Sequence, residues 1–201
     1  MRKKGRLYHF WRYLKHVLTA WNTTGEGIHS PYLFHLVRFV LRDENTFYAF
    51  NEMAPSVTGR AMFRIVNFMT QHEKHPLTIM EVGEEGVLTT YLQRPDSRNN
   101  VTVVDADSLF KHARGRVDVA YVQAGGTKDE LLKMTNFLLP RLTEKGVLVL
   151  EGIHDSDEAE QVWQALKADR RVTSSIDTYY TGMVFVDRHY LKRHYRVRIE
   201  N

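Results

Sequence analysis

The first quarter of the chain follows a helical pattern of hydrophobic positions. Apolar side chains recur every three or four residues and so share one stripe of a helix, formed by Leu7, Phe10, Trp11, Leu14, Val17, Leu18 and Trp21. Residues 23–27 break this pattern, and Ser30-Pro31 supplies a capping hydroxyl and a first-turn proline for a second helix. A third helix is predicted from Ser56 to just before Pro76. We therefore expect a helical N-terminal extension over residues 1–55.

From residue 77 onward the pattern changes to short apolar runs separated by helical segments. These runs predict a buried strand over residues 77–82 and further strands over residues 101–104, 117–122, 146–150, 172–176 and 183–186. Helices are expected over residues 86–93, 128–139 and 157–168. Strands that alternate with helices are typical of a mostly parallel sheet covered on both faces, and the last two strands suggest an antiparallel hairpin. We therefore expect an α/β domain over residues 56–187, followed by a basic C-terminal tail over residues 188–201.

The composition excludes several classes of protein. The chain has 201 residues, a length that suits one domain with an appendage. It has no cysteine, which excludes disulfide frameworks, iron–sulfur clusters and thiol nucleophiles. No apolar stretch approaches the ~20 residues needed to span a bilayer, and the basic, aromatic N-terminus does not resemble a secretory signal. These features predict a soluble, cytoplasmic protein.

The net charge of +4 is concentrated at the two ends of the chain. Residues 1–25 carry six basic residues and no acid, and residues 188–201 carry five basic residues and one acid. A basic amphipathic helix can lie in a membrane interface, which would make the protein peripheral at the inner face of the membrane. The alternative is that its apolar stripe packs on the α/β domain or on a second copy of the chain. The tail is more typical of a solvated edge strand or tail than of a nucleic-acid site.

Two short segments carry candidate chemistry. Glu81, Gly83 and Gly86 follow the first predicted strand, where an acid and two glycines let the backbone approach a ligand at the carboxyl edge of a parallel sheet. They are candidate cofactor-binding residues, with a plain strand-to-helix turn as the alternative. His154, after the fourth predicted strand, is a candidate general base near neutral pH. The alternative is a histidine that packs against the loop or caps the next helix.

This order of elements, with the acid-rich first turn and the closing hairpin, resembles the class I S-adenosylmethionine-dependent methyltransferases. It is most similar to a bacterial group with a Gly-x-His-Ser-Pro segment in a helical extension, here residues 27–31. That group's motif Asp-Asp-Ile-His-x-Ser corresponds here to residues 151–156, followed by Trp163. The resemblance implies a Rossmann-like methyltransferase fold. It also implies that Asp105, at the end of the second strand, would hold the ribose hydroxyls of S-adenosylmethionine.

The connection after Asp105 departs from the family pattern. Only twelve residues, 106–117, separate Asp105 from Asp118, whereas a strand-helix-strand crossover needs about a dozen or more in its connection. The fold is therefore expected to be shortened by about one β-α unit and to lack a wall for the adenine. In the first turn, Glu84 and Glu85 place two carboxylates where the carboxylate of the cofactor would dock. Both departures predict weak or absent binding of S-adenosylmethionine.

The catalytic positions also depart from those of related metal-dependent O-methyltransferases. Gln123, Glu151 and Gly152 stand where those enzymes carry acidic metal ligands, and only Glu151 supplies a carboxylate, so no metal is expected. The leading hypothesis is a degenerate methyltransferase-like domain that acts as a binding or interaction module. Its partner would be an unknown protein or a second copy, bound through the N-terminal helix. The alternatives are an active methyltransferase, in which Glu151 or His154 deprotonates the acceptor, and a peripheral membrane protein.

Overall fold

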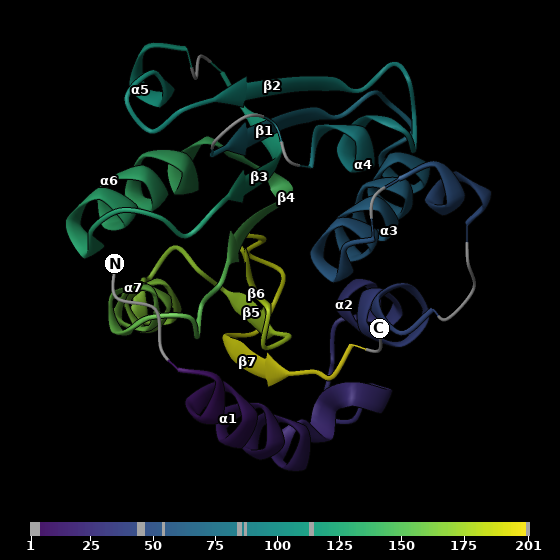
Figure 1. Ribbon diagram of the computed structural model, residues 1–201. Coiled ribbons are helices and arrows are strands. Elements are labelled where there is room, and N and C mark those ends of the chain that lie inside the picture. Colours follow the sequence, from purple (N-terminus) through teal and green to yellow (C-terminus); the bar gives the residue numbers. More distant parts are fainter. Residues whose placement is uncertain are drawn as a thin grey trace.

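The computed structural model of the protein describes residues 5–43, 47–53, 55–83, 86, 88–112 and 115–199 (Figure 1). Its centre is one sheet with the strand order β2-β1-β3-β4-β6-β5-β7. Strand β6 is antiparallel to both of its neighbours, and the other pairs are parallel. The strands are β1 (Thr78–Val82), β2 (Asn100–Val104), β3 (Val117–Val122), β4 (Leu142–Glu151), β5 (Ser174–Asp177), β6 (Thr181–Phe185) and β7 (Arg193–Arg196).

Helices cover both faces of this sheet (Figure 1). Those of the N-terminal half are α1 (Arg6–Thr19), η1 (Trp21–Thr24), α2 (Pro31–His35), η2 (Leu36–Leu41), η3 (Tyr48–Glu52), α3 (Val57–Glu73) and α4 (Thr89–Gln93). The others are α5 (Leu109–His112), α6 (Lys128–Leu138), η4 (Leu139–Arg141) and α7 (Asp157–Ala168). Side-chain hydroxyls begin several of them: Ser30 accepts the N–H of Leu33, as the sequence predicted, and Ser156 accepts the N–H of Ala159.

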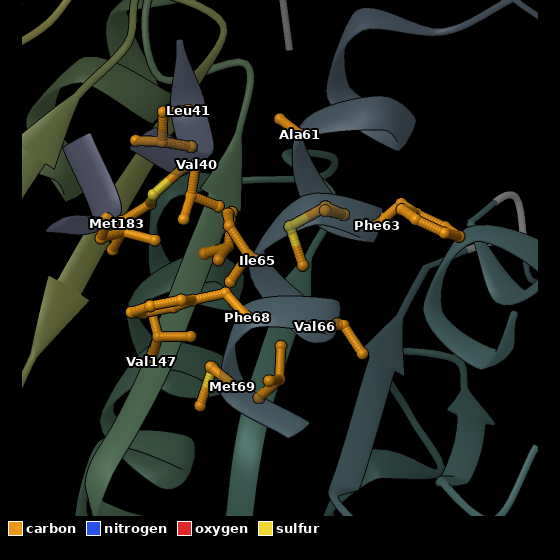
Figure 2. Packing of buried hydrophobic residues seen from close by; sticks show 14 of the residues in the cluster. Val40, Leu41, Ala61, Phe63, Ile65, Val66, Phe68, Met69, Val147 and Met183 are labelled. Atoms are coloured by element: carbon orange, nitrogen blue, oxygen red, sulfur yellow. The ribbon is translucent and has the colours of Figure 1, made fainter. Parts of the chain in front are cut away.

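The alternation of side chains along the strands divides the core into two layers. One layer places η2 and α3 against strand residues such as Val119, Val147, Val149 and Met183. Figure 2 shows Ile65, Phe68 and Met69 of α3 beside Val147 of β4. The other layer packs α6 and α7 against the residues in between, which are Met80, Val82, Ala120, Val122, Leu148, Leu150 and Val184. Because both faces are buried, the central strands are mostly apolar, with Glu81 and Asp118 as buried exceptions.

The α/β class and the mostly parallel sheet predicted from the sequence are confirmed by this topology. Among the described residues between β2 and β3, the only regular element is α5, so β2 forms one edge of the sheet. The predicted C-terminal tail contributes the opposite edge, because residues 193–196 form β7 beside β5. None of the helices within the described ranges combines the length and the hydropathy that a membrane-crossing segment needs.

Candidate functional site

The parallel strands end at one edge of the sheet, and the candidate residues lie along that edge. Glu81 is the penultimate residue of β1, and its side chain is buried. One carboxylate oxygen, Oε1, accepts the backbone N–H of Leu88 at 2.7 Å, and Oε2 accepts the hydroxyl of Thr89, also at 2.7 Å. Both oxygens of Glu81 therefore hold the start of α4. These hydrogen bonds give the carboxylate of Glu81 a role in holding the fold together.

The two candidate glycines lie in the turn after β1. A Cβ atom on Gly83 would come within 2.9 Å of Oε1 of Gln123, so the side chain of Gln123 covers this glycine. Gly86 has a φ of +57°, in the left-handed region that favours glycine. Glu84 and Glu85, which the sequence placed against the cofactor carboxylate, lie outside the described residues.

Asp105 follows β2 and is exposed. Its Oδ1 accepts the backbone N–H of Ser108 at 2.7 Å, which stabilises the turn that leads into α5. The strand before it is open on its outer side: Val104 is its one buried residue, and Val103 is 40% exposed. Asp105 is thus in the place that the resemblance assigns to a ribose-binding acid, at a sheet edge with no further strand beside it among the described residues.

Glu151 ends β4 and is hydrogen-bonded to a tyrosine. The hydroxyl of Tyr121, from the adjacent strand β3, donates to Oε2 of Glu151. Burial first, and then the charge of Glu151, raises the pKa of Tyr121, so that this hydroxyl keeps its proton and remains a donor. One oxygen of Glu151 is therefore occupied by an internal hydrogen bond.

His154 is buried between α1 and the β5–β6 hairpin, with both ring nitrogens in hydrogen-bond contact. Nη2 of Arg12 lies 3.1 Å from Nδ1, and the carboxylate of Asp177 lies 3.1 Å from Nε2. A guanidinium can only donate, so Nδ1 accepts from Arg12, and the ring proton on Nε2 is donated to Asp177. The lone pair that a general base needs is thus engaged by Arg12, which also pairs with Glu160.

A second histidine of α1, His16, lies on the same carboxylate. Its Nε2 donates to the carbonyl oxygen of Val197 at 3.0 Å, while Nδ1 is buried, has no hydrogen bond and lies 3.4 Å from Oδ1 of Asp177. Burial lowers the pKa of His16 against the opposing effect of Asp177. Burial also acts to raise the pKa of Asp177, but the hydrogen bond from His154 and the two nearby histidines hold it below its usual value. Sequence reasoning missed this cluster, because its members are far apart along the chain.

His16, His154 and Asp177 also form a buried group whose side chains could hold a metal ion. One ligand atom from each lies within 4.8 Å of the others. The donor set does not fit a metal, however, because Arg12 occupies Nδ1 of His154 and so leaves the proton on Nε2, the atom that faces Asp177. The cluster is a hydrogen-bonded attachment of α1 to the sheet.

Helix α1 packs on the domain through its polar and aromatic face. Tyr179 of the hairpin donates its hydroxyl to the carbonyl oxygen of His9 and packs edge-to-face against Tyr13. One expectation from the sequence, that the apolar stripe packs on the α/β domain, is wrong: Leu7 is 71% exposed and Leu18 is 76% exposed. The remaining large members of the stripe, Phe10, Trp11, Leu14 and Trp21, are exposed as well. The physical reason is that the hydrogen-bonding residues of α1 lie on the opposite side of the helix and satisfy the buried groups of the sheet edge.

An open groove of about 490 Å³ lies between α1 and the hairpin. Its lining is aromatic and mixed in charge, and consists of Arg6, His9, Phe10, Tyr13, Asp155, Tyr179 and Tyr180. Because Tyr179 also lies against the ring of His154, the groove is next to the buried cluster. It offers a flat or aromatic group a place to stack, with Arg6 at its rim.

No protein-family model and no curated protein sequence matches this chain. Solved structures match it at low identity. A SAH-bound methyltransferase from Podospora anserina is 12% identical, with a TM-score of 0.43, over 92% of this chain and 98% of that one. A protein from Corynebacterium glutamicum is 12% identical, with a TM-score of 0.49, over 88% and 97% of the two chains.

The MycE methyltransferase of the mycinamycin biosynthetic pathway, solved with Mg and SAH, is a further match. It is 13% identical, with a TM-score of 0.47, over 69% of this chain and 51% of MycE, so this chain spans about half the length of that enzyme. These similarities concern the fold alone and say nothing of what this chain binds.

Proposed function

We propose that this chain is a methyltransferase-fold protein that no longer catalyses efficient methyl transfer and acts as a binding or interaction module, with α1 as its contact surface. The position of β2 at the sheet edge carries this proposal, because α5 is the only regular element between β2 and β3 in the described part of the chain. In the methyltransferase fold a further strand and its loop would enclose the adenine there. The exposed side chain of Val103 marks the uncovered strand.

The state of the candidate catalytic groups supports the same proposal. Glu151 is hydrogen-bonded to Tyr121, and His154 is held between Arg12 and Asp177. A group that removes a proton from an acceptor needs an accessible lone pair at the place where the acceptor lies. Both groups are instead hydrogen-bonded to neighbouring elements of the fold, which is typical of a structural role.

Calorimetric titration of the full chain with S-adenosylmethionine, and separately with SAH, tests the proposal. We expect no heat of binding or a dissociation constant near ~1 mM. Micromolar binding that is lost in Asp105→Ala would contradict the proposal, because it would show a working ribose contact. Asp107→Ala is the matched control, since Asp107 is also exposed in the segment after β2 but is not at the strand end.

The second candidate function is an active S-adenosylmethionine-dependent methyltransferase with a shortened pocket. The exposed carboxylate of Asp105 and the left-handed turn at Gly86 favour it, since both are features that a nucleotide-like cofactor uses at this edge. The acceptor would attack the methyl carbon, SAH would leave, and Glu151 or His154 would take the acceptor's proton. Either residue would first have to break a hydrogen bond that it makes in the structure before it could contact the acceptor.

A further inference from the structure

We propose that the exposed apolar stripe of α1 and η1 docks on an anionic membrane surface. This inference rests on the proposed role of α1 as the contact surface and names the partner; it does not depend on whether S-adenosylmethionine binds. The stripe comprises six large apolar side chains that are all exposed: Leu7, Phe10, Trp11, Leu14, Leu18 and Trp21. Contiguous exposed apolar surface of this kind marks an interaction site on a folded protein.

The orientation of the stripe is fixed by the fold. His16 is buried on the opposite side of α1 and donates to Val197, while Arg12 contacts His154 and Glu160. These long-range contacts hold the helix against the sheet edge along its length. In Figure 1 α1 lies at one end of the molecule, beside β7 and α7, so its outer side faces away from the domain. The stripe is therefore presented outward by a rigid attachment.

The charges around the stripe select an anionic partner. At 3.6 residues per turn, Arg6 and Lys15 lie on the two flanks of the stripe, and both are exposed. Arg196 adds a third cation at the last turn of α1, where its guanidinium donates to the hydroxyl of Thr19. Residues 1–25 contain no acid. An apolar stripe bordered by cations, with tryptophan in it, is the pattern of a helix that lies in a bilayer interface and binds anionic lipid headgroups.

The same charges disfavour a second copy of the chain as the occupant. A two-fold symmetric contact through α1 would place Arg6 and Lys15 of one copy near the same cations of the other. Since residues 1–25 hold no acid, this segment offers the facing cations no opposite charge. Like charges across an interface repel and suppress that pairing.

Vesicle binding of the full chain tests the proposal. The probes are vesicles of phosphatidylcholine alone and of phosphatidylcholine with about one-third phosphatidylglycerol, which supplies the anionic surface. The chain has three tryptophans; Trp11 and Trp21 are exposed and Trp163 is buried, so a blue shift of emission on binding reports the stripe. We expect sedimentation with the anionic vesicles and this blue shift.

Matched variants separate the stripe from general surface effects. Leu18→Ser should weaken binding about tenfold, because one largely exposed leucine no longer enters the interface. Leu191→Ser is its control, a comparably exposed leucine away from α1 that should leave binding unchanged. Lys15→Gln should weaken binding to anionic vesicles about fivefold and leave the weak binding to neutral vesicles unchanged. All three side chains are exposed, so the variants should fold, and their circular dichroism melts verify this.

Three results would overturn the proposal. They are absence of wild-type binding, binding that Leu18→Ser leaves unchanged, and a wild-type dimer that Leu18→Ser converts to a monomer without any vesicle binding. The last result would assign the stripe to a second copy. The outcome of the calorimetric titration does not depend on the outcome of the vesicle experiment. Micromolar binding of S-adenosylmethionine would contradict the proposal that the cofactor site is degenerate, but it would not affect the membrane proposal.

Discussion

At the residue scale, the unpartnered Nδ1 of His16 makes the attachment of α1 depend on pH. Burial lowers the pKa of His16, so below its ordinary value near ~6.5 the unfolded chain binds a proton that the folded chain does not. The stability contributed by the neutral histidine is therefore lost as the pH falls below ~6.5 toward the lowered folded pKa.

Urea unfolding between pH ~8 and ~5 measures this dependence. In His16→Gln the amide can still donate to the carbonyl oxygen of Val197, but it does not titrate, so we expect a smaller loss of unfolding free energy at the acidic end than in the wild type. His75→Gln, at an exposed position, should retain the wild-type slope. Equal slopes in His16→Gln and the wild type would refute the assignment.

At the scale of elements, the packing of α7 on β6 depends on one glycine. A Cβ atom on Gly182 would lie 2.6 Å from the ring of Trp163, which is fully buried. We expect Gly182→Ala to lower the unfolding free energy by about 1–3 kcal/mol, because the tryptophan has no room to move. Chemical denaturation measures the change.

A double-mutant cycle identifies the cause of this loss. Trp163→Phe in the Gly182→Ala background should recover part of the stability, since the smaller ring leaves room for the methyl group. Gly125→Ala is the control: a Cβ there meets nothing within 4 Å, and the substitution should be close to neutral. A loss that is additive in the double variant would mean that the two residues are not coupled.

The elements also show which parts of the fold the sequence predicted. Runs of mostly apolar residues predicted six of the strands, because strands buried on both faces leave such runs in the sequence. Strand β2 was found in the same way, although only Val104 of it is buried. Strand β7 was harder to recognise, since Arg193-His194-Tyr195-Arg196 buries only Tyr195 at the sheet edge. The prediction that the apolar stripe of α1 packs on the domain was wrong. An apolar stripe normally marks a buried face, but here polar residues of the opposite face make the contacts with the domain.

The candidate site was less predictable than the fold. Spacing along the chain places Glu81 at the end of β1 and Gly83 and Gly86 in the turn that follows it, and their role in cofactor binding stays a prediction. The partners of His154 could not be found in this way: Arg12 and Asp177 lie 142 and 23 residues away, and only tertiary structure brings them together. Periodicity carries information about local elements and burial, and it carries none about which distant polar groups meet.

At the scale of the whole molecule, the two ends of the chain are joined, and Asn22 is the central link. Asn22 is buried, donates to the carbonyl oxygen of Glu26 at 2.7 Å and accepts the backbone N–H of Arg196 in β7 at 3.1 Å. Nearby, the backbone N–H of Arg198 donates to the hydroxyl of Thr23. The N-terminal helices thus dock on the last strand, so the presentation of the α1 stripe depends on the C-terminal segment.

Asn22→Ala should therefore loosen both ends together. It removes the partner of two part-buried backbone groups, the carbonyl oxygen of Glu26 and the N–H of Arg196, which should lower the unfolding free energy by about 1–2 kcal/mol. Hydrogen exchange should increase in α1, η1 and β7 but not in β1 or β3, because the hydrogen bonds of Asn22 join the turn after η1 to β7. Asn67→Ala, on α3, is the matched control, since its amide accepts a single exposed hydrogen bond from Gln71. Faster exchange in α1 with unchanged exchange in β7 would show that the ends dock independently, and the stripe would then need no support from the C-terminal strand.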